Sequence, residues 1–85
     1  MDDEFDVQRL EKHMKEGFTE IAFTDSYWRI RLEAYRALGF KESALADPNP
    51  TIRREAYIRM DRIGDAEKDP DPYVRKLASG GTIGY

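Results

Sequence analysis

Hydrophobic residues recur along the chain at the spacing of helices that bury one face. Two apolar stripes, each within one arc at about 100° per residue, consist of Ile30, Ala34, Ala37 and Leu38, and of Ile52, Ala56, Met60 and Ile63. Val7, Leu10 and Met14 predict a further helix over about 5–16, which Gly17 would end. No segment alternates apolar and polar residues with a period of two, so the pattern predicts an all-α fold.

The chain also contains an internal repeat of 22 residues. Residues 47–56 and 69–78 share the string D-P-[ND]-P-x-[IV]-R-[RK]-x-A, and residues 25–34 keep part of it. A second string, G-F-x-E-x-A, begins at both Gly17 and Gly39 with the same offset. Two separate strings with one period indicate repeating structural units. We expect four of them, at about 3–24, 25–46, 47–68 and 69–85.

Each unit is expected to form one good helix and a short helical segment. Asp25, Asp47 and Asp69 suit the N-cap position, so helices should begin near them, and the prolines that follow Asp47 and Asp69 suit the first turn. Gly39 suits a helix C-cap, and residues 18–24, like their copy one repeat later, are long enough for one or two turns. Units this short cannot bury their own apolar faces, so they should stack.

The repeated string resembles two related families, the HEAT-like repeats and the leucine-rich repeat variant. The residues that carry the resemblance are 47–56 and 69–78, with a weaker copy at 25–34. The resemblance covers about residues 17–79 and implies a short right-handed α-solenoid of about four repeats, so we expect one solenoid domain over residues 1–79. Gly80 and Gly81 indicate that residues 80–85 form a flexible C-terminal tail. The resemblance also implies a binding scaffold, and some members of these families bind nucleic acid.

Composition narrows the chemistry. The chain has no Cys and one His, His13, which excludes thiolate metal sites and cysteine nucleophiles and disfavours a Ser/His/Asp triad. Neither an enzymatic activity nor a cofactor is expected. The net charge of −3 weighs against general nucleic-acid binding. No apolar run approaches the ~20 residues of a membrane span, so we expect a cytoplasmic protein.

An acidic cluster near the C-terminus does not predict a metal site. Its members lack the alternating spacing of a calcium-binding loop, so we expect a solvated turn with capping duties, formed by Asp61, Asp65, Asp69 and Asp71.

The repeat aligns three arginines, and their role has two interpretations. In the first, each arginine pairs with a capping Asp of its own or a neighbouring unit, because the planar guanidinium suits bidentate carboxylate pairing. In the second, the arginines and the tyrosines one turn later form a stripe that binds a partner. The residues of that stripe are Arg31, Tyr35, Arg53, Tyr57 and Arg75.

Three hydrophobic residues lie off the main apolar arcs. Trp28 and Leu32 are expected to form a second packing face against the first helix, at Val7, Leu10 and Met14. Ile58 has fewer partners within the chain and is a candidate for an exposed contact with another protein. The favoured function is therefore a small protein-binding scaffold, such as an adaptor, inhibitor or complex subunit. The alternative is a nucleic-acid-binding module that uses the arginine–tyrosine stripe.

Overall fold

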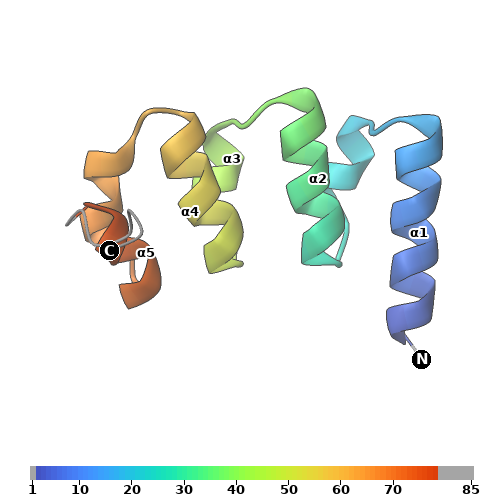
Figure 1. Ribbon diagram of the computed structural model, residues 1–85, viewed down its shortest axis with the longest axis horizontal. Coiled ribbons are helices and arrows are strands. Elements are labelled where there is room, and N and C mark those ends of the chain that lie inside the picture. Colours follow the sequence, from blue (N-terminus) through green and yellow to red (C-terminus); the bar gives the residue numbers. More distant parts are fainter. Residues whose placement is uncertain (1, 79–85) are drawn as a thin grey trace. The chain divides into compact units, whose positions relative to one another are not determined.

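The computed structural model describes residues 2–78 of the 85-residue chain, and side chains from Phe5 onward (Figure 1). Within this range the chain contains helices and no strand, which confirms the all-α prediction. The predicted tail at 80–85 lies outside the described residues. The elements in chain order are α1 (Asp2–Glu16), the 3₁₀ helix η1 (Glu20–Thr24), α2 (Trp28–Leu38), α3 (Glu42–Leu45), α4 (Pro50–Arg59), the 3₁₀ helix η2 (Ile63–Lys68) and α5 (Pro72–Ala78).

The chain divides into two compact units, of which the first spans residues 1–39. Here η1 packs against α2, and α2 also contacts α1 (Figure 1). Buried Ala22, Ile30 and Ala34 form the centre of this unit, and the half-buried residues around them are Leu10, Phe18, Phe23 and Tyr27. The His13 ring stacks on Phe18 at 5.4 Å between centroids, and His13 is half-buried.

The second unit spans residues 40–85 and contains α3, α4, η2 and α5. Helix α4 contacts α3, η2 and α5, and α5 packs closely on η2 (Figure 1). Tyr57 of α4 meets Ala66, Val74 and Leu77 in one buried cluster. The unit thus joins parts of two sequence repeats through one set of apolar side chains.

The 22-residue period reappears in what is buried. The three largest fully buried side chains are Ile30, Ile52 and Val74, which occupy one position of the repeat. A second position holds three alanines without exposed surface, Ala22, Ala44 and Ala66. The carbonyl of each alanine accepts a hydrogen bond from the repeated Asp three residues later, at 3.2, 3.3 and 3.0 Å. This bond closes the short helical segment of each repeat.

Helices α2 and α4 begin two residues later than the N-cap assignment of the aspartates predicted, since their N-caps are Tyr27 and Asn49. The N-cap of α4 is Asn49, whose side chain accepts from the backbone N–H of Thr51, and Pro50 is the first helical residue. A residue that precedes proline is disfavoured in the α region, and Asn49 is extended at φ −87° and ψ 121°. A helix that began at Asp47 would have to run through Asn49, so the second proline of each D-P-x-P string sets the start.

The predicted apolar arcs are partly wrong. Leu38 and Ile63 are 47% and 40% exposed, and Ala37 is also exposed. Tyr35 and Tyr57 are buried instead, each five residues after the central Ile of its helix. Helix α4 ends at Arg59, and Asp61 has a positive φ of 60°, so Ile63 does not continue the helical face.

The packing predicted for the first helix is also partly wrong. Leu32 is buried and Trp28 is half-buried, as a second packing face requires. However, Val7 and Met14 are 45% and 65% exposed, and only Leu10 of the three α1 residues contributes to the core of unit 1. Gly17 and Gly39 each follow the end of a helix and have positive φ values of 94° and 110°, which confirms that they terminate these helices.

Candidate functional site

The repeated aspartates form the same turn in all three repeats. One carboxylate oxygen accepts from the backbone N–H two residues later, at 2.8 Å for Asp25, 2.9 Å for Asp47 and 2.9 Å for Asp69. This is the Asx arrangement, in which the side chain fixes the chain direction before a helix. The aspartates therefore cap the turn that leads into each helix, and they are not the N-caps predicted from the sequence.

The three aligned arginines bind the backbone at these turns. Arg31, Arg53 and Arg75 each donate through Nη1 to the main-chain carbonyl of the Asp six residues earlier. The three distances are 2.8, 2.7 and 2.8 Å. A guanidinium that holds this carbonyl ties the first turns of a helix to the loop before it. The arginines are engaged within the chain as the ladder interpretation expected, but the acceptor in these three bonds is the main-chain carbonyl of the Asp and not its carboxylate.

Arg53 also binds the next Asp along the chain. Its Nε and Nη2 donate to Oδ2 and Oδ1 of Asp69, at 2.8 and 3.1 Å, in a bidentate pair. The side chains are 12% and 1% exposed. The Tyr57 hydroxyl donates to Asp69 Oδ2 at 3.3 Å. Asp69 is thus buried and saturated with donors, which corrects the expectation of solvation at this position, whereas Asp61 and Asp65 are exposed as expected.

Unit 1 contains an equivalent pair that the sequence reasoning missed. Arg9 donates through Nε and Nη2 to Asp25 at 3.1 and 2.8 Å, and Nη2 also meets Asp6 at 2.8 Å. Arg9 lies 22 residues before Arg31. The alignment of the repeats contained this signal, but the rest of the string is lost in the first unit.

These bonds account for the length of the repeat. Arg53 lies six residues after one aspartate and sixteen before the next, and it binds both. The two separations together make the 22-residue period, and Arg9 and Asp25 have the same separation of sixteen. An insertion between the repeated Asp and Arg would move the guanidinium away from one of its two acceptors.

The paired carboxylates have lowered pKa values. The hydrogen bonds from Arg9 hold the pKa of Asp25 below its ordinary value despite partial burial. For Asp69, burial acts to raise the pKa, but the bonds from Arg53 and from the backbone N–H of Asp71 outweigh it, so the pKa is lowered. Burial and the Asp69 carboxylate together raise the pKa of Tyr57. Both carboxylates are therefore ionised at neutral pH.

The predicted binding stripe is not an accessible surface along its length. Tyr35 and Tyr57 are 2% and 9% exposed, because Tyr35 stacks on Phe23 at 4.6 Å and Tyr57 lies in the core of unit 2. Neither ring therefore has the accessibility that the stripe interpretation requires. Arg53 is engaged with Asp69, while Arg75 lies on the surface. Ile58, the predicted exposed contact, is 40% exposed.

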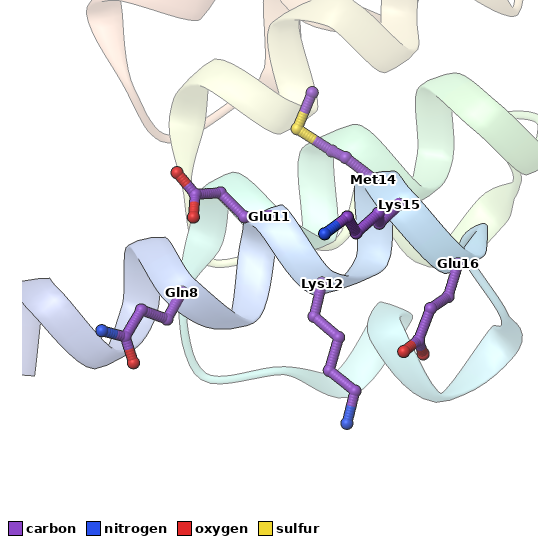
Figure 2. Close-up of a pocket in the computed structure, with 6 residues that line it drawn as sticks. All are labelled: Gln8, Glu11, Lys12, Met14, Lys15 and Glu16. Carbon is purple, nitrogen blue, oxygen red and sulfur yellow. The ribbon is translucent and has the colours of Figure 1, made fainter.

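Other surface features offer little chemistry. Figure 2 shows an open concavity on α1, lined by Gln8, Glu11, Lys12, Met14, Lys15 and Glu16. Two acidic and two basic side chains line it, and Lys12 and Glu16 extend to one side while Met14 extends to the other. Within residues 2–78, no group of three His, Asp or Glu side chains could hold a metal ion. No helix in the described part of the chain is long and apolar enough to cross a membrane.

Comparisons with known proteins do not assign the chain to a family. No protein-family model matches the chain, and neither a curated protein nor a solved structure matches it.

Proposed function

We propose that the chain is a non-catalytic protein-binding scaffold in which helical repeats stack as a short α-solenoid. The arginine–aspartate networks act as the framework, because they fix each turn and each helix start with charge-assisted hydrogen bonds. Exposed side chains on the helices then bind the partner protein.

The observation that carries this proposal is the number of large hydrophobic side chains on the surface. A monomeric protein exposes single apolar residues routinely, but extended apolar surface marks interaction sites. Eight such residues of the described chain are 40–79% exposed, namely Phe5, Val7, Met14, Ile21, Leu38, Ile58, Ile63 and Tyr73. The large hydrophobic side chains buried in the described chain are fewer, namely Ile30, Leu32, Tyr35, Ile52, Tyr57, Val74 and Leu77. A partner would cover some of this apolar area and gain stability from doing so.

Nucleic-acid binding has less support from these contacts. The stripe that would stack on bases requires accessible aromatic rings, and the rings of Tyr35 and Tyr57 are buried. Arg53 already has a carboxylate partner, so its charge is compensated within the protein. A protein partner could bind other surface residues and requires neither accessible tyrosine rings nor an uncompensated Arg53.

The test compares capture of partners by the full chain and by a variant of its exposed surface. Nuclease-treated extract is passed over immobilised wild type, Ile58→Ser and Lys68→Ser, the last being a control at an exposed position of η2. We expect a partner that binds wild type and the control and is lost with Ile58→Ser. Salt-sensitive binding of single- or double-stranded oligonucleotides, together with no protein partner, would contradict the proposal.

A further inference from the structure

Arg54 differs from the other arginines of the described chain. The rest each donate to a carboxylate or to a main-chain carbonyl, and they are Arg9, Arg29, Arg31, Arg36, Arg53, Arg59, Arg62 and Arg75. Within residues 2–78, Arg54 makes no ion pair, and its Nε is buried without a hydrogen-bond partner. A buried donor without an acceptor costs free energy, and an external acceptor would bind the Nη atoms of this half-buried side chain, which are not among the buried unpartnered atoms.

The Arg54 guanidinium lies beside an aromatic ring. Its guanidinium carbon lies 5.5 Å from the centre of the Tyr73 ring, in a cation–π contact between α4 and α5. Tyr73 is 48% exposed. One turn after Arg54, on the same side of α4, Ile58 is 40% exposed. A half-buried cation is therefore flanked by two accessible hydrophobic side chains.

We propose that Arg54, Ile58 and Tyr73 form a docking surface for an acidic, apolar peptide segment of a partner protein. A carboxylate of that segment binds the Arg54 guanidinium, and a neighbouring apolar or aromatic side chain packs on Tyr73 and Ile58. This inference rests on the proposed function and adds the location of the surface and the chemistry of its ligand.

Charge complementarity favours an acidic peptide over a nucleic acid. Nucleic-acid binding draws on several uncompensated cations that follow the phosphate backbone. The other cations of α4 are already paired, Arg53 with Asp69 and Arg59 with Glu55. Arg54 is the one cation of this helix without a carboxylate partner in the described part of the chain, and a single guanidinium beside apolar surface fits one carboxylate beside an apolar side chain.

The test uses a library of short random peptides selected against the full chain. We expect enrichment of peptides in which Asp or Glu lies within a few residues of an aromatic or aliphatic side chain. Arg54→Met keeps the unbranched stem and removes the guanidinium, and it should weaken the selected peptides about tenfold or more. Tyr73→Ala should weaken them as well. The matched control is Arg59→Met, on the same helix and paired internally with Glu55, and it should bind like wild type.

A double-mutant cycle between Arg54 and the acidic residue of a selected peptide tests their ion pair. Replacing the peptide's Glu by Gln should weaken binding to wild type but not to Arg54→Met, because the pair is already broken. Selected peptides that lack acidic residues, or that bind Arg54→Met and Arg59→Met equally, would overturn this surface while leaving the scaffold proposal standing. A library that yields no binder would contradict both.

Discussion

The two bidentate pairs share one geometry and differ in their surroundings. In unit 1, Arg9 and Asp25 are 41% and 15% exposed, and Arg9 divides its donors between Asp25 and Asp6. In unit 2, Arg53 and Asp69 are 12% and 1% exposed, and the same network includes the carbonyl of Asp47 and the hydroxyl of Tyr57. The sequence separation of sixteen residues is identical.

Because the two pairs have the same bond pattern, their different burial should decide how much each contributes to stability. An exposed ion pair is screened by water and contributes little. A buried pair contributes little net stability against an apolar replacement, yet loss of one partner leaves an uncompensated buried charge. Arg53 should therefore be much less tolerant of substitution than Arg9, although the repeat alignment treats them as equivalent.

The largest expected effect follows from Arg53→Ala. The substitution leaves the buried Asp69 carboxylate without its cation, which should lower the free energy of unfolding by about 2–4 kcal/mol. For a domain of this size, the Tm should fall by about ten degrees or more. Arg9→Ala is the matched control, and its loss should be clearly smaller. Equal losses in thermal or urea unfolding would show that burial does not distinguish the pairs.

Lowering the pH should reduce the difference in unfolding free energy between wild type and Arg53→Ala. The folded pKa of Asp69 lies below its ordinary value of 3.8. Its contribution to stability is therefore present above about pH 4 and is lost as the pH falls through the folded pKa. Urea unfolding of both proteins from pH 7 down to pH 2 checks this. A gap that stays constant across the acid range would contradict the role of the Asp69 charge.

Tyr57→Phe should have a smaller effect. It removes the hydroxyl that donates to Asp69 at 3.3 Å and keeps the ring in the core. The expected loss is about 0.5–1.5 kcal/mol, the range for one hydrogen bond. Tyr73→Phe, at an exposed ring, is the comparison and should leave stability unchanged. A Tyr57→Phe protein as stable as wild type would indicate that Arg53 alone satisfies Asp69.

The smallest effect is expected at Arg62. It binds Glu42 at 2.8 Å and Asp65 at 2.6 Å, but these carboxylates are 77% and 58% exposed. Water can replace both contacts, so Arg62→Ala should leave the Tm within a degree or so of wild type. A large fall would mean that an exposed charge cluster stabilises unit 2, and it would weaken the distinction drawn from burial.

Much of this arrangement could be predicted from the sequence. The 22-residue period located the buried Ile30, Ile52 and Val74. It also aligned an aspartate at one position of the repeat and an arginine at another, which indicated that the two residue types pair, as Arg53 and Asp69 do. The rule that residues before proline avoid the α region would have placed the start of α4 at Pro50.

Other features depend on packing that a one-dimensional pattern does not contain. Tyr57 has the polarity of a surface residue, but its ring fills the space between α4, η2 and α5 while its hydroxyl reaches Asp69. Ile63 continues a helical arc in the sequence, but the positive φ of Asp61 ends that helix first. The exposures of the two bidentate pairs differ because of their neighbours, and both pairs have the same sequence signature.

The role of the buried pair is tested most directly by a double-mutant cycle between Arg53→Ala and Asp69→Ala. We expect the two losses in unfolding free energy to be strongly non-additive, with a coupling of at least about 1 kcal/mol. The corresponding cycle with Asp47→Ala should show weaker coupling, because Arg53 binds the main-chain carbonyl of Asp47, which Ala retains. Losses for Arg53 and Asp69 that add to within about 0.5 kcal/mol would contradict the claim that this buried pair holds the repeat together.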